Sequence, residues 1–390
     1  MPMNHNRLFQ LSTILSMTLL TASCNWFHPA QEEHITPDEL STLIPARVKD
    51  RESWASDIVA ISNELNIEVN TQNMCTIIAV VDQESNFVAD PVVAGLGAKA
   101  IREINERLEQ KLGKKMAAYF ENMLKTKPTP EDNYLGQIRQ VKTEKQLDEL
   151  YREMFSFYSK QYHVTMLTGA AKFVGQDVAE NFNPINTLGS MQVHIDYAKK
   201  HKPRMMSMQQ LRDELYSQYG GLYYGIHRLM LYPAKYEEPI YRFADYNSGM
   251  YSSRNAAFQK VLNDLSDEQL ILDGDLLMYN KDGDAKLQKS STENALILYF
   301  STDPTAPSVR QIRSDLKLEK SEKFEQTKTY LHLIAQYEKK TGKVAPYALM
   351  PKVVISGPKL SRDYNTNWFA SRVNGRYKQC MQKAKRLKLT

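Results

Sequence analysis

The sequence contains few residues that commonly bind metals: three cysteines and eight histidines among 390 residues. The cysteines form no C-x-x-C pair, and the histidines are scattered along the chain. Neither pattern is typical of a zinc or iron site. We therefore expect no metal ion and no cofactor.

A strong excess of charge is also missing, because 50 basic side chains face 45 acidic ones and the net charge is +5. So slight an excess gives no indication of nucleic acid as a partner. After the first 24 residues, no stretch approaches the roughly 18 consecutive apolar residues that a membrane-spanning helix needs. The length exceeds the ~250 to 300 residues at which one core stops growing, so we expect two lobes or one domain with large insertions.

The first 24 residues are typical of an export signal. Arg7 is followed by an apolar stretch from Leu8 to Leu20 and by small residues before Cys24. The pattern resembles a bacterial lipoprotein signal, which implies that Cys24 is lipidated and becomes the mature N-terminus. Asn25, in place of Asp, then implies the outer membrane, with the protein on its periplasmic face and held by the lipid only. The alternative is a plain secretory peptide.

Hydrophobic periodicity predicts a mostly α-helical protein. Polar residues 25–50, with three prolines, are expected to form a linker, and the basic tail KAKRLKLT a frayed end. Residues 270–287 are expected to be extended. Helices are expected at 53–65, 101–124, 144–162, 208–231, 252–265, 293–300 and 321–337, with a last one around Trp368 to Cys380.

The stretch 71–87, TQNMCTIIAVVDQESNF, carries the candidate catalytic residue, Glu84. If it is helical, Ile77, Val81 and Glu84 lie on one side, and the carboxyl lies at the edge of an apolar stripe. Partial withdrawal from water disfavours the ionised carboxylate, and a glycosidic bond needs a proton donor of that kind. The alternative is a buried strand that ends in a solvated glutamate, because the run is rich in β-branched residues.

Three short stretches stand in order along the chain: ESNF from Glu84, GSMQV from Gly189 and ADYNSG from Ala244. Together they resemble the motifs E-S-x-F, G-L-M-Q and A-Y-N-x-G of the soluble lytic transglycosylases, members of the lysozyme-like superfamily. The resemblance implies a lysozyme-like α+β domain over residues 51–265. The chain as a whole resembles an uncharacterised family of bacterial envelope lipoproteins that carry such a domain.

The resemblance implies that Glu84 acts alone as acid and base on peptidoglycan glycan strands. It would protonate the β-1,4 bond between N-acetylmuramic acid and N-acetylglucosamine and leave a 1,6-anhydro product. Tyr246 matches the motif tyrosine that hydrogen-bonds this glutamate, and Ser190 replaces the motif leucine at the cleft wall. The implied substrate-binding residues are Ser85, Ser190, Met191, Gln192, Tyr246 and Asn247.

The spacing departs from compact members of that family, because 105 positions separate Glu84 from Gly189. We expect residues 98–175 to form an inserted helical subdomain. Residues 266–390 are expected to form an extension, with a small hairpin and helices, packed on the same domain. Once Cys24 is set aside, Cys75 and Cys380 form either a disulfide or two separate buried thiols.

Two other functions compete with the transglycosylase. A goose-type lysozyme would hydrolyse the same bond and needs a second carboxylate for water, with Asp82, Asp90 and Asp196 as candidates. A non-catalytic envelope protein could keep the fold and bind glycan. The sequence identifies no protein partner.

Overall fold

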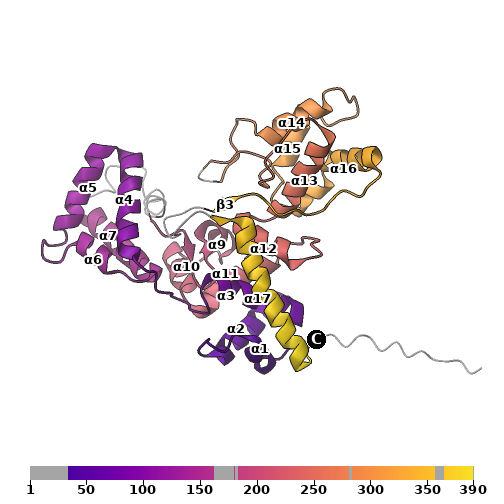
Figure 1. Ribbon diagram of the computed structural model, residues 1–390. Helices are drawn as coiled ribbons and strands as arrows, with labels where there is room; N and C mark the ends of the chain where they lie inside the picture. The colour runs from indigo at the N-terminus through magenta and orange to yellow at the C-terminus, as the bar shows by residue number, and fades with distance from the viewer. Residues whose placement is uncertain (1–33, 162–179, 181–182, 281–282, 356–363, 390) are drawn as a thin grey trace, which may run out of the picture. The chain divides into compact units, whose positions relative to one another are not determined.

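The computed structural model describes residues 34–161, 180, 183–280, 283–355 and 364–389, and these are mostly helical (Figure 1). Residues 33–390 form one compact unit. None of the described helices is both long and apolar enough to cross a bilayer. Helices that contribute to the first hydrophobic core include α1 (Pro37–Leu43), α2 (Arg51–Glu64), α3 (Thr71–Glu84), α9 (Ile195–His201), α10 (Met208–Leu215), α11 (Gln218–Met230), α12 (Pro239–Ser248) and α17 (Thr366–Leu387).

Helix α3 is the centre of this core. Its N-cap is Asn70, whose side chain accepts a hydrogen bond from the Asn73 amide at 2.8 Å. All residues from Met74 to Asp82 are buried. The β-branched run is therefore helical because α11 and α17 pack on it, and the helix prediction is confirmed over the strand alternative.

Two of the predicted long helices are each broken into two. In place of the helix expected at 101–124 there are two, α4 (Leu96–Leu112) and α5 (Lys114–Thr126). Gly113, at φ 80°, lies between them and caps both. The one expected at 208–231 is α10 and α11, because the Ser217 side chain caps a new helix. Periodicity alone did not reveal either break.

The inserted segment contains α4, α5, α6 (Tyr134–Gln140) and α7 (Glu144–Gln161), which pack on one another in sequence order. Buried side chains of all four helices belong to the first core, and α7 also forms a salt bridge with α10. Asp148 of α7 accepts a hydrogen bond at 2.7 Å from Arg212 of α10, which is fully buried. The last residues of the predicted insertion, up to 175, lie outside the described part.

Residues 258–337 contribute a second core of their own, so the single extension expected over 266–390 is divided. It contains most of α13 (Ser252–Leu265), with α14 (Ser291–Phe300), α15 (Val309–Leu316), a 3₁₀ turn η1 (Glu322–Gln326) and α16 (Lys328–Thr341). The chain then forms a two-stranded antiparallel pair, β3 (Val354–Ile355) with β4 (Tyr364–Asn365), and α17 returns to the first core.

Both ends of the described part of the chain were wrongly expected to be loose. Part of the predicted linker is α1, whose Leu40 is fully buried together with the following Ile44. The basic tail continues α17 as far as Leu387. A disulfide between Cys75 and Cys380 joins α3 to α17, so the second of the two cysteine alternatives is excluded. The hydrophobic faces of both end helices explain their order, because burial offsets the entropy lost on folding.

Candidate functional site

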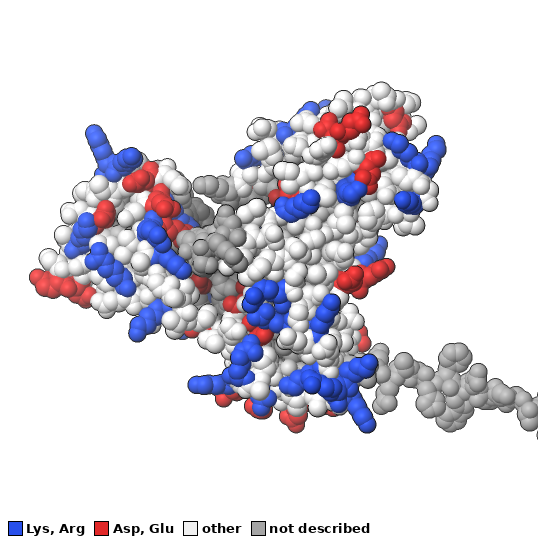
Figure 2. Space-filling view, viewed as in Figure 1, with Lys and Arg blue, Asp and Glu red and all other residues white. Residues whose placement is uncertain are grey.

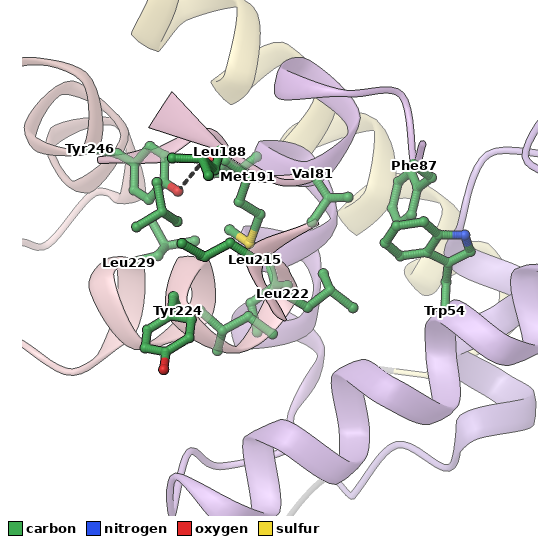
Figure 3. Close-up of a cluster of buried hydrophobic side chains, with 14 of the residues drawn as sticks. Trp54, Val81, Phe87, Leu188, Met191, Leu215, Leu222, Tyr224, Leu229 and Tyr246 are labelled. Carbon is green, nitrogen blue, oxygen red and sulfur yellow. Dashed lines mark hydrogen bonds between the residues drawn. The ribbon is translucent and has the colours of Figure 1, made fainter. Parts of the chain in front are cut away.

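Glu84 is the last residue of α3 and its side chain is half-buried. The chain turns sharply after it, with Asn86 and Phe87 both in the left-handed region at φ 53° and 61°. A bulky residue rarely adopts that conformation, and such strain is concentrated at functional sites. Phe87 is held because its ring packs edge-on against Trp54 of α2, with 5.3 Å between ring centroids (Figure 3). The turn therefore fixes the direction in which the chain leaves α3.

The second motif forms the turn between β1 (Thr187–Leu188) and β2 (Val193–His194), which rests on α11. Gly189 is at φ 77°, and a Cβ there would lie 2.3 Å from the Leu215 carbonyl oxygen. A Cβ on Gly225 of α11 would likewise lie 2.3 Å from the Met191 sulfur. These two glycines let the turn seat Met191 among Leu215, Leu222 and neighbouring side chains of the core (Figure 3).

Tyr246 of the third motif connects the other two. Its hydroxyl donates a hydrogen bond to the Met191 carbonyl at 2.7 Å, drawn as a dashed line in Figure 3. Burial raises the pKa of Tyr246; the nearby Arg228 guanidinium opposes this rise, and the Glu84 carboxylate adds to it. The phenol thus lies within electrostatic reach of Glu84. Three stretches far apart in sequence converge at the C-terminal end of α3.

Arg228 of α11 belongs to this site, and sequence reasoning missed it. Its guanidinium carbon lies 4.6 Å from the centroid of the Tyr246 ring, a cation–π contact. Burial lowers the pKa of His194, Asp196 raises it, and Arg228 lowers it further, so its charge also reaches β2. No motif signals Arg228, because HRLM at the end of an amphipathic helix has the appearance of an ordinary helix end.

Several residues expected to line sugar sites are instead part of the support. Ser190 and Met191 are fully buried, so in this conformation they offer no surface to a ligand. Ser85 is 4% exposed, and its hydroxyl donates to the Val81 carbonyl at 3.3 Å and accepts from the Val88 amide at 3.4 Å. The same physical reason applies to all three residues. The two turns are closely packed, so the side chains that shape them are buried and are not available to a ligand.

Gln192 and Asn247 remain half-buried beside the site. The Gln192 side chain accepts from the Thr187 hydroxyl at 3.0 Å and donates to the Gly189 carbonyl at 3.2 Å and to Glu144 at 3.3 Å. Gln192 therefore ties the motif turn to α7 of the inserted segment. Asn247 Oδ1 is buried and has no hydrogen-bond partner among the described residues.

The three carboxylates considered for hydrolysis lie in different environments. Asp82 is buried and both its oxygens are engaged, one by Arg47 and one by Arg376 Nε at 2.9 Å. Asp196 is exposed and faces His194 Nδ1 at 3.4 Å. Asp90 Oδ1 is buried and has no hydrogen-bond partner in the described part of the chain. Of the three, only Asp90 keeps a buried oxygen without such a partner.

The described ranges hold no cluster of three or more histidine, cysteine or acidic side chains that could bind a metal. Cys24, the predicted lipidation site, lies outside them. A pocket of about 310 Å³ is lined by polar side chains including Gln72, Asn73 and Arg242. Because Gln72 and Asn73 are in the first turn of α3, this pocket is at the opposite end from Glu84 and is separate from the site.

Comparison with known proteins identifies a family. Residues 47–383 match the model described as "Protein of unknown function (DUF1615)". The chain is 34% identical over 384 residues to the "Uncharacterized protein YaiW" of Escherichia coli (strain K12), covering 97% of this chain and 99% of that protein. No solved structure matches. With most of its length matched by the model, this chain belongs to the DUF1615 family.

Proposed function

We propose that this protein is a lytic transglycosylase-like lipoprotein that cleaves the β-1,4 bond between N-acetylmuramic acid and N-acetylglucosamine in peptidoglycan. One observation carries the proposal. The three motif stretches meet at the C-terminal end of α3. There the Tyr246 hydroxyl donates a hydrogen bond to the Met191 carbonyl, and burial, together with the Glu84 carboxylate, raises the pKa of Tyr246. A chain that merely contained three chance matches would have no reason to bring them together.

Glu84 is the proposed acid and base. Its place at the end of a buried helix keeps the carboxyl partly out of water. A proton delivered to the glycosidic oxygen allows the leaving sugar to depart. The same carboxylate then takes the proton of the muramoyl 6-hydroxyl, which closes the 1,6-anhydro ring. The supporting residues are Tyr246, held by Met191, and the unsatisfied amide oxygen of Asn247.

The engaged state of Asp82 favours this route over hydrolysis. A hydrolase that uses two carboxylates needs the second one free to activate water. Asp82 is two residues from Glu84, yet Arg47 and Arg376 occupy its oxygens. The acetamido group of the substrate would instead meet the positive charge at the sugar carbon.

The proposed location is the periplasmic face of the outer membrane, with Cys24 as the lipid attachment. The disulfide between Cys75 and Cys380 supports export, because such bonds persist in oxidising compartments. Peptidoglycan lies in the same compartment, so a tethered enzyme would meet its substrate there.

The test is digestion of purified sacculi followed by mass spectrometry of the products. We expect anhydro-muropeptides from the wild type and a loss of about 100-fold or more in Glu84→Gln, the range for removal of a general acid. The matched control is Glu52→Gln, an exposed glutamate on α2, which should cleave like the wild type. Equal melting temperatures would show that both variants fold. Absence of any product from the wild type would refute catalysis.

A goose-type hydrolase is the second candidate, and Asp90 is the observation that favours it, because its Oδ1 is buried without a partner among the described residues. That enzyme would yield reducing ends in place of anhydro ends, and Asp90→Asn would abolish them. A non-catalytic glycan-binding protein would instead sediment with sacculi without cleaving them, and Glu84→Gln would bind equally well.

A further inference from the structure

Helix α17 has an unusual distribution of charge. Between Thr366 and Leu387 it carries six lysines and arginines and no acidic residue, and Lys388 follows at its C-cap. The chain as a whole is nearly balanced, so this segment holds far more than its share of positive charge. A segment with so much positive charge either binds a negatively charged partner or faces solvent.

The last two turns of α17 gather most of these cations. Lys385, Arg386 and Lys388 are exposed, and among the described residues they form no ion pair, whereas Arg376 pairs with Asp82. Partial burial lowers the pKa of Lys383, and the charges of Arg51 and Arg386 lower it further. Lys383, Arg386 and Arg51 at the start of α2 therefore lie within electrostatic reach of one another, and Lys385 and Lys388 lie close to Arg386 in the sequence. Figure 2 shows Lys and Arg side chains gathered over this end of the helix.

Both ends of the described chain meet near this cluster. The Ile35 amide donates to the Val69 carbonyl at 2.9 Å, just before α3 begins. The hydroxyl of Thr71, the first residue of α3, donates to the Leu389 carbonyl. Helix α1 also contacts α17. The cluster therefore lies at the N-terminal end of α3, whereas Glu84 lies at its C-terminal end, about 20 Å away along the helix.

The proposed lipid anchor would hold this same end close to a membrane. Ile35 follows Cys24 by 11 positions, and a chain of that length spans at most ~35 to 40 Å. Leu387, 47% exposed among the basic residues, adds an apolar side chain of the kind found at membrane surfaces. Positive charge, an exposed leucine and the beginning of the described chain thus share one end of the compact unit.

We propose that the basic end of α17, formed by Lys383, Lys385, Arg386 and Lys388 with Arg51, binds the head groups of anionic phospholipids. This surface is a second attachment beside the N-terminal lipid, and it rests on the proposed anchor and not on catalysis. Two attachments at one end restrict rotation on the membrane. The Glu84 end then faces away from the bilayer, toward the peptidoglycan layer.

Vesicle co-sedimentation of the unlipidated compact unit, residues 33–390, tests this surface. We expect binding to vesicles of phosphatidylglycerol and phosphatidylcholine, none to phosphatidylcholine alone, and a decrease as salt rises. The triple variant Lys383→Glu, Lys385→Glu, Arg386→Glu should bind at least about tenfold more weakly, since each basic residue near an anionic surface contributes about fivefold.

The matched control is Lys328→Glu, Lys339→Glu, Lys343→Glu, three exposed lysines of the second core region. It changes the net charge equally and should bind like the wild type. Equal losses of vesicle binding in both triple variants would overturn the proposal, and so would no binding to anionic vesicles. It would also be overturned if the same residues bound sacculi more strongly than anionic vesicles. Glu84→Gln should bind vesicles normally, so failure here is distinct from failure of the cleavage assay.

Discussion

The two ends of α3 are built in different ways. At the N-terminal end, Cys75 is bonded covalently to Cys380, and Thr71 donates to Leu389. At the C-terminal end, no covalent link holds Glu84, and the surroundings come from two turns and from helices α11 and α12. The first end is fixed by one neighbouring helix, whereas the second depends on several segments packing together.

Asp82 and Glu84 show how this difference acts on two carboxylates that are two residues apart. Asp82 faces α17 and is paired with Arg376, so it is part of the cross-linked side. Glu84 is two residues further along, and burial, together with the Glu84 carboxylate, raises the pKa of Tyr246. A rigid base with the proposed acid at its edge is the arrangement that precise positioning requires. Changes at the first end should therefore affect stability, and changes at the second should affect cleavage.

The largest expected effect is the loss of the disulfide. The bond closes a loop with a sequence separation of 305 residues, and removing a native disulfide typically costs about 2 to 5 kcal/mol of unfolding free energy. Dithiothreitol should therefore lower the denaturant midpoint of the wild type. The double variant Cys75→Ala, Cys380→Ala should start lower and show no further response to reductant.

Cleavage per folded molecule should be unchanged by reduction, because the hydrogen bond between Tyr246 and Met191 does not involve either cysteine. A wild type that is insensitive to reductant would show that the bond contributes nothing to stability. Activity that fell much faster than the folded fraction would show that the two ends are not independent.

Asp82→Ala should have the next largest effect, about 2 kcal/mol, because it removes charge-assisted hydrogen bonds and leaves Arg376 without its carboxylate. Arg47→Ala is the control. That side chain is 55% exposed, so its loss should cost less than about 1 kcal/mol while Asp82 keeps Arg376. Urea unfolding measures both. Loss of cleavage by a folded Asp82→Ala protein would return Asp82 to the list of catalytic carboxylates.

The sequence indicated a helix at α3, with a strand as the alternative, and it revealed the three motif stretches by resemblance, because periodicity and local residue identity are encoded within short windows. It could not show that Ser190 and Met191 are buried, since this depends on Gly225 of a helix far along the chain. Arg228 was missed for the same reason, because its role comes only from its contact with Tyr246. The two chain ends were judged by their polar composition, which hid the few apolar residues that dock them.

The smallest expected effect on stability comes from Tyr246→Phe, which tests the link between the motif turns directly. The variant keeps the ring and removes the 2.7 Å hydrogen bond to the Met191 carbonyl, which should cost about 1 kcal/mol. Tyr224→Phe is the matched control, since Tyr224 is 1% exposed in the same core and its hydroxyl has no hydrogen bond to another described residue. Urea midpoints and the rate of anhydro-muropeptide release measure the two effects.

We expect Tyr246→Phe to slow cleavage more than its modest loss of stability explains, because the phenol lies within electrostatic reach of the Glu84 carboxylate and the Met191 turn would lose its hydrogen bond to Tyr246. Tyr224→Phe should change neither quantity, since its ring stays packed and no bond is lost. If both variants cleaved at the wild-type rate, the Tyr246 hydroxyl would contribute only to the packing of the core. The C-terminal end of α3 would then be as purely structural as the disulfide end.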